Sequence, residues 1–328
     1  MELKTRNLIF KILLIVIVII LVILGVAAWL LQIPRYHWLR KRSTLLHLDE
    51  TFQERKDRQK RQKDRIVVSL STIPDRIHLM GPTLASWMDQ TVLPDEICIN
   101  VPVLSRKGKK YDMPRWMSRL ENVTIHRVDE DEGPGTKLLP TLRRERAKEH
   151  GDRTRIICGD DDNIYNSKTI ETLLRVHRHY EKRGKLVAVS NYGVTLNHDE
   201  ELPGIPERVR TLFVSERRTD LLQGFSGFLI TPKMIPEHAY DIHNGPKEAI
   251  SVDDIWFSGW LNINGVPIIS PGHIVSHLPI VSFGEMRDTP ALAKGENKHF
   301  VTDMKVIRWF IDDMGFVPVR KHRHGSSF

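Results

Sequence analysis

The chain has 328 residues, of which 41% are hydrophobic and 27% charged, so wholesale disorder is excluded and there is room for a sizeable core. The net charge of +8 is confined to residues 1–65, which hold 14 of the 49 basic and 6 of the 41 acidic residues and leave 35 of each beyond. This neutral balance over residues 66–328 argues against nucleic acid as a partner. With only Cys98 and Cys158 present, a disulfide framework is also excluded.

The first element is an uncharged stretch that follows a short N-terminal tail, residues 1–11. Residues 12–31 carry no charge, and a helix of twenty residues spans roughly the 30 Å hydrocarbon core of a bilayer. We therefore predict a single-pass transmembrane anchor over residues 12–33. No small-residue cleavage site follows, which favours a signal anchor over a cleaved signal peptide. We expect a type II orientation, with the domain in the Golgi or ER lumen of a eukaryote, although the near balance of flanking Lys and Arg leaves a cytosol-facing domain open.

A charged segment over residues 34–65 follows the predicted anchor. Its second half, DETFQERKDRQKRQKDR, holds one aromatic residue and no aliphatic one. Such a run is typical of a solvated stem, helical or disordered, that holds a domain off the bilayer. Contact with anionic lipid is the alternative.

Residues 66–328 are predicted to form one domain in which strands alternate with helices. This order predicts an α/β fold with a mainly parallel sheet flanked by helices. The predicted strands cover residues 66–70, 96–101, 123–128, 155–159, 186–190, 224–231 and 267–270, and the predicted helices cover residues 83–90, 137–150, 168–183 and 255–261.

Three consecutive aspartates, Asp160, Asp161 and Asp162, follow the apolar strand at residues 155–159. In open parallel sheets ligands bind beyond the carboxyl ends of the strands. Mg²⁺ or Mn²⁺ is commonly held there by one or two carboxylates while substrate phosphates complete the shell. The triplet thus predicts the metal and diphosphate site of an enzyme that uses a sugar nucleotide. A solvated turn whose aspartates cap the next helix is the alternative.

Four motifs together resemble glycosyltransferases of the GT-A (Rossmann-like) fold, close to the family-2-like group whose DxD motif binds a nucleotide-diphospho-sugar. The resemblance covers about residues 66–282. The motifs are VVSLSTIPDRI at residues 67–77, DEGPGTKLLPTL at residues 131–142, the aspartate triplet, and VDDIW at residues 252–256.

The resemblance implies roles for particular residues. The first loop, with Ser71, Thr72 and Arg76, is expected to grip the nucleotide. Lys137 in the second motif is expected to reach it too, the alternative being an exposed lysine in the first turn of a helix. The resemblance also implies that a histidine completes the metal shell, for which His273 and His277 are the candidates, although either is equally a surface or packed histidine.

Within the triplet, Asp160 and Asp162 are assigned to the metal and the ribose, with Asp162 as the direct metal ligand. Asp161 is grouped with the nucleotide-sugar-binding residues, but it points to the opposite face if the strand alternation persists, which favours a structural role.

An acceptor hydroxyl needs a carboxylate to take its proton as it attacks the anomeric carbon. We predict Asp254 as this base and Asp253 as its supporter, and direct displacement would then invert the anomeric configuration. The alternative is that the two aspartates only cap the helix at residues 255–261, where the helix dipole favours them.

The sequence therefore predicts a membrane-anchored glycosyltransferase that depends on Mn²⁺ or Mg²⁺. Its partners would be a nucleotide-sugar donor, a glycan, protein or lipid acceptor, and the membrane through residues 12–33. One alternative is a catalytically inactive GT-A-like binding or scaffold protein. The other is a nucleotidyltransferase that makes sugar nucleotides, but its first loop would be Gly-rich and basic, and STIPDRIHLMGP is a poor match.

Overall fold

The structure, a computed structural model, describes residues 11–23, 33–59, 63–197, 199–203, 215–271, 280–281 and 301–319. Within these residues the centre of the fold is a sheet of eight strands in the order β3-β2-β1-β4-β10-β6-β11-β8. The strands are β1 (Ile66–Ser71), β2 (Glu96–Pro102), β3 (Val123–Val128), β4 (Arg155–Cys158), β6 (Ala188–Ser190), β8 (Arg217–Thr219), β10 (Phe228–Ile230) and β11 (Ile268–Ser270). Only β8 and β10 run against the other six.

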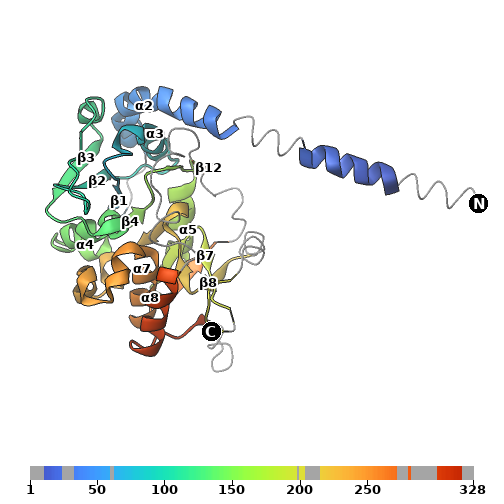
Figure 1. Ribbon diagram of the computed structural model, residues 1–328. Coiled ribbons are helices and arrows are strands. Elements are labelled where there is room, and N and C mark those ends of the chain that lie inside the picture. Colours follow the sequence, from blue (N-terminus) through green and yellow to red (C-terminus); the bar gives the residue numbers. More distant parts are fainter. Residues whose placement is uncertain are drawn as a thin grey trace, which may run out of the picture.

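Helices cover both faces of this sheet (Figure 1). One face packs against α2 (Ile33–Arg58), α3 (Gly81–Met88) and α5 (Thr169–Glu181), and the other against α4 (Leu139–Arg146), α7 (Asp253–Ile263) and α8 (Val301–Asp312). The alternation of side chains along each strand divides the core in this way. In β4, for example, Ile157 belongs to the first core and Ile156 to the second. The prediction of an α/β fold with a mainly parallel sheet flanked by helices is confirmed.

Two short strand pairs lie beside the main sheet. β5 (Asn163–Ile164) pairs with β12 (Ile280–Val281), and β7 (Gly193–Val194) pairs with β9 (Leu221–Leu222). The first pair begins directly after the aspartate triplet, so β12 returns to the carboxyl end of β4.

The predicted transmembrane helix over residues 12–33 is wrong. In the part of the chain that the structure describes, no helix combines the length and the apolar character needed to cross a membrane. The helical residues 11–23 are apolar but too few for a span, and residues 24–32 of the predicted span lie outside the described residues. The next helix, α2, starts at Ile33 and is rich in charged residues.

The charged segment after it is not a solvated stem. α2 packs along α3, and its Leu45 and Phe52 are buried in the core. Asp49 accepts hydrogen bonds from the backbone N–H groups of Glu121 (3.0 Å) and Asn122 (3.1 Å). Leu45 and Phe52, with the partly buried Leu48, therefore form one apolar stripe against the core, which the high charge of the segment conceals in the sequence. The domain boundaries themselves stay a prediction.

The helix predicted over residues 137–150 is broken near its start. A 3-10 turn covers Gly133–Lys137, and α4 begins only at Leu139, with Pro140 in its first turn. Gly133 adopts a φ of 62°, and a Cβ there would lie 2.2 Å from the carbonyl oxygen of Ile250. Lys137 is thus fixed by a tight turn that only glycine permits at that position.

Candidate active site

The candidate site lies where β1 and β4 end side by side. The two strands pair in parallel, with Ser69 opposite Cys158, so the segments that leave them emerge together. Thr72 and Arg76 follow β1, and the aspartate triplet follows β4. A parallel register thus brings together residues almost ninety positions apart, at the edge of the sheet where ligands bind in such folds.

Asp161 ties these two segments to each other. Its carboxylate accepts hydrogen bonds from the Thr72 hydroxyl (2.6 Å) and the Arg76 guanidinium (2.9 Å), and its backbone carbonyl accepts one from the Thr83 hydroxyl (2.8 Å). Asp161 is buried. These internal bonds fit the structural role that strand alternation predicts for it, and they occupy Thr72, which we had assigned to the nucleotide.

The other two aspartates of the triplet remain open to solvent. The side chains of Asp160 and Asp162 are 32% and 31% exposed. Arg76 also contacts Asp162 at 3.2 Å. Burial, with the charges of Asp161 and Asp160 beside it, raises the pKa of Asp162 to about 7, against the opposing effect of Arg76. Ionising the whole triplet is therefore unfavourable without a further positive charge.

Lys137 joins the triplet to the second acidic group. Its ammonium lies 2.8 Å from Asp160, 3.0 Å from Asp253 and 3.8 Å from Asp254, and only 7% of the side chain is exposed. Burial opposes its charge, but the three carboxylates outweigh that effect and hold the pKa of Lys137 well above its ordinary value. The alternative of an exposed lysine is therefore wrong.

The backbone of Lys137 is fixed by residues that the sequence analysis did not assign to the site. The Ser69 hydroxyl donates to the Lys137 carbonyl at 2.5 Å, and the Asn100 amide donates to the Thr136 carbonyl at 3.0 Å. Both side chains point from the middle of a strand toward the turn below the site. Their polar character inside apolar strands was the available signal.

Asp253 and Asp254 occupy the first turn of α7, and no side chain caps this helix. Both oxygens of Asp254 accept a hydrogen bond from the backbone N–H of Gly224, at 3.0 and 2.9 Å. Burial and the nearby Asp253 and Asp160 raise the pKa of Asp254 to about 8, although Lys137 acts to lower it. The capping alternative explains the position of the two aspartates on the helix but not their approach to Lys137 and Gly224.

Gly224 also belongs to the site. A Cβ at this position would lie 2.5 Å from the Lys137 ammonium, 3.0 Å from Asp254 Oδ1 and 3.2 Å from Asp160 Oδ1. The three charged groups therefore meet in the space that its missing side chain leaves. The small residues Gly224, Ser226 and Gly227 indicated close packing in this segment, but not which groups approach Gly224.

The remaining candidates are Ser71 and two histidines. Ser71 ends β1 at the edge of the site, but its role stays a prediction. His273 and His277 lie outside the described residues, so their assignment to the metal also stays a prediction. Trp256, which follows the two aspartates, is fully buried and donates to the Ala239 carbonyl at 3.0 Å, so it belongs to the core.

Asp160 and Asp162 suit a divalent cation chemically. Within the described residues, no group of three or more His, Cys, Asp and Glu side chains is arranged to hold a metal ion by itself. A Mg²⁺-type site needs fewer protein ligands, because one or two carboxylates suffice when substrate phosphates and water supply the rest. The two partly exposed carboxylates, with their excess negative charge, fit that kind of shared site.

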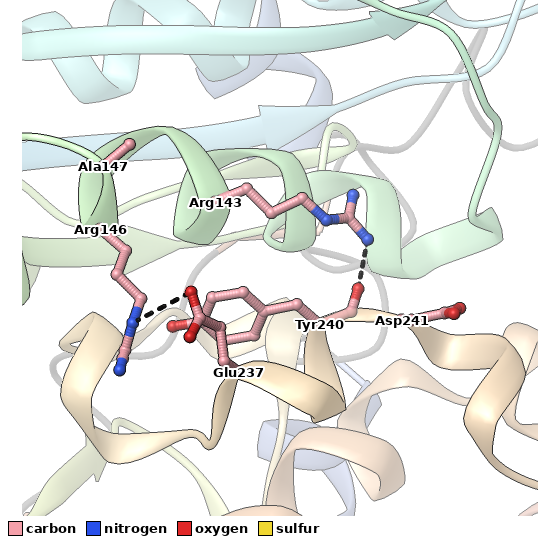
Figure 2. Close-up of a pocket in the computed structure, with 6 residues that line it drawn as sticks. All are labelled: Arg143, Arg146, Ala147, Glu237, Tyr240 and Asp241. Atoms are coloured by element: carbon pink, nitrogen blue, oxygen red, sulfur yellow. Dashed lines mark hydrogen bonds and ion pairs between the residues drawn. The ribbon is translucent and has the colours of Figure 1, made fainter.

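An open pocket of about 310 Å³ lies elsewhere, between α4 and the segment around Tyr240. It is lined by Arg143, Arg146, Ala147, Glu237, Tyr240 and Asp241, none of which we predicted as a site residue (Figure 2). Arg143 binds Glu132 and the Tyr240 carbonyl, and Arg146 pairs with Glu237 at 3.6 Å. Both guanidinium groups of this pocket are thus already engaged by the protein.

No family model matches the chain, and no curated protein matches it. Among solved structures, it is similar to S. aureus TarS 1-349 in complex with UDP, at 13% identity and a TM-score of 0.40, over 62% of this chain and 57% of that one. TarS 1-349 in complex with UDP-GlcNAc matches at 11% identity and a TM-score of 0.41, over 75% of this chain and 71% of that one. At these identities and TM-scores the similarity does not establish a common family.

Proposed function

We propose that the chain is a GT-A-like glycosyltransferase that moves a sugar from a nucleotide-diphosphate donor to an acceptor hydroxyl. The proposal rests on one observation, namely that Asp160 and Asp254 both approach the buried ammonium of Lys137. The absence of a side chain at Gly224 leaves the room for this approach. Two acidic groups almost a hundred positions apart in the chain thus contact the same side chain. Sugar transfer from such a donor needs a cation-binding site and a general base close to each other.

Asp160 and Asp162 would hold Mn²⁺ or Mg²⁺, with Asp162 as the direct ligand. When bound, the cation neutralises the charge that develops on the leaving diphosphate. Lys137 adds a fixed positive charge on the same side, in a water-poor environment where it acts more strongly than in bulk water. Arg76, which is held by Asp161, supplies a second positive charge at the edge of the triplet.

Asp254 would act as the base. As the acceptor oxygen forms its bond to the anomeric carbon, the hydroxyl proton passes to Asp254, and the bond from that carbon to the diphosphate breaks with its electron pair leaving on the diphosphate. The Gly224 N–H fixes both oxygens of Asp254, so that the carboxylate is oriented before the acceptor arrives. Displacement in one step inverts the anomeric configuration.

The test is a screen of the full chain against UDP-, GDP- and CMP-sugars, with and without Mn²⁺, measuring release of the nucleotide. We expect Mn²⁺-dependent release from one donor class. Asp312→Asn, at the exposed end of α8, serves as the matched control and should behave as the wild type. If no donor is bound or cleaved with Mn²⁺ or Mg²⁺, the proposal fails and an inactive scaffold becomes the better description.

A further inference from the structure

One aromatic side chain is partly exposed at the candidate site. The 3-10 turn Gly224–Ser226 and the following Gly227 are buried except for Phe225. The residue before the turn, Gln223, is also partly exposed and carries an amide group. The turn therefore presents an apolar ring flanked by a polar side chain.

Phe225 lies between the two acidic groups. On one side it is bonded to Gly224, whose N–H binds Asp254. On the other, its backbone carbonyl accepts a hydrogen bond from the Asn163 amide at 3.3 Å, and Asn163 directly follows Asp162. The backbone of Phe225 thus lies between a residue that binds the proposed base and the residue that follows the proposed metal ligand.

The position of this turn is fixed by several contacts. The Ser226 hydroxyl accepts the Tyr192 N–H at 2.9 Å, and the Asn191 amide donates to the Ser226 carbonyl at 3.1 Å. The rings of Phe225 and Tyr192 lie 5.6 Å apart at 52°. An aromatic ring held in this way loses little conformational entropy when a ligand covers it.

From these contacts we infer that Phe225 is the platform on which the acceptor lies, and that the acceptor is a sugar. A pyranose ring has an apolar C–H face that suits an aromatic ring and a rim of hydroxyl groups that suits an amide such as Gln223 and a carboxylate such as Asp254. A glycan acceptor therefore matches this surface better than a protein hydroxyl or a simple lipid alcohol. The inference rests on the proposed function and narrows its acceptor to a carbohydrate.

The experiment measures nucleotide release by the full chain with Mn²⁺ and the donor found in the screen, alone and with methyl glycosides of glucose, galactose, mannose and N-acetylglucosamine. We expect at least one glycoside to raise the rate. In Phe225→Ala, the ratio of glycoside-dependent to glycoside-independent release should fall about tenfold, mainly through a higher acceptor KM, while Phe225→Tyr should restore it. Tyr180→Ala, on α5, controls for removal of a partly exposed aromatic ring.

Each outcome bears on one claim. No release from any donor means that the proposed function itself has failed. Release by the wild type that no glycoside stimulates, or stimulation only by a serine-containing peptide or a long-chain alcohol, overturns the sugar acceptor. Unchanged acceptor KM in Phe225→Ala overturns the platform while leaving the transferase proposal intact.

Discussion

The two ends of β1 and β4 carry buried charges of very different kinds. At the amino ends, Arg155 is almost fully buried and pairs with Asp64 at 2.9 Å and Glu181 at 2.6 Å. Glu145, on α4, is fully buried and contacts Arg65 at 3.2 Å. At this end each buried charge has an opposite charge beside it.

At the carboxyl ends the charges do not balance. In the described part of this site, two cations face five carboxylates, namely Arg76 and Lys137 against Asp160, Asp161, Asp162, Asp253 and Asp254. Balanced pairs stabilise the fold, whereas carboxylates with raised pKa values in an open site are typical of ligand binding and catalysis. The same strands therefore serve stability at one end and, on our proposal, chemistry at the other.

The largest effect is expected for Asp254→Asn. The variant keeps the shape of the carboxylate but cannot accept the proton, so the transfer rate should fall by about 10²- to 10⁴-fold. Steady-state rates measured beside Asp312→Asn test this. A variant that transfers as fast as the wild type would show that Asp254 is not the base.

Replacing Arg155 tests the balanced end. Arg155→Met leaves Asp64 and Glu181 without their shared partner, and it should lower the free energy of unfolding by about 3–5 kcal/mol. Urea denaturation of the full chain gives this value. A loss below about 1 kcal/mol would contradict the view that this end is a structural cluster.

His177 adds a pH dependence to the same end. Burial and the nearby Arg155 lower its pKa from 6.5 to about 4, with Lys233 acting the same way and the Val187 carbonyl and Glu181 opposing. As the pH falls, His177 is therefore protonated in the unfolded chain before it is protonated in the folded chain. The stabilisation that comes from the neutral side chain is complete above about pH 6.5 and is lost as the pH falls toward 4.

Denaturation curves between pH 4 and 7 measure this contribution, which should reach about 3 kcal/mol. His177→Asn can keep a hydrogen bond to the Val187 carbonyl, which the histidine ring makes at 2.9 Å, but it cannot titrate. Its stability should vary less with pH than that of the wild type. Equal slopes of unfolding free energy against pH for the two proteins would show that His177 does not cause the pH dependence.

The two ends of the strands are compared most directly by neutralising one carboxylate at each end. Glu145→Gln should lower the free energy of unfolding by about 1–3 kcal/mol, because Arg65 and Lys148 lose a charged partner. Asp162→Asn, measured without metal, should instead raise the melting temperature, because it relieves repulsion within the triplet. Thermal melts of both variants in a chelating buffer test this, and a shift of the same sign in both would contradict the contrast between the two ends.

The sequence predicted the sheet and the acidic groups because their signals are local. Apolar runs such as residues 66–70 and 155–159 are sufficient to indicate buried strands, and consecutive aspartates are visible without a structure. The helix α2 was misjudged because its buried residues, Leu45 and Phe52, are spread among many charged ones. The bridging of the two acidic groups by Lys137 depends on a close approach over Gly224, which no local pattern encodes.

The most direct test separates donor binding from transfer in two variants. With the donor found in the screen, calorimetry with and without Mn²⁺ gives donor affinity, and product formation gives transfer. We predict that Asp162→Asn loses Mn²⁺-dependent donor binding, whereas Asp254→Asn binds the donor with Mn²⁺ but forms product about 10²- to 10⁴-fold more slowly than the wild type. Full transfer by either variant, or loss of donor binding in both alike, would contradict the division of roles between the two acidic groups.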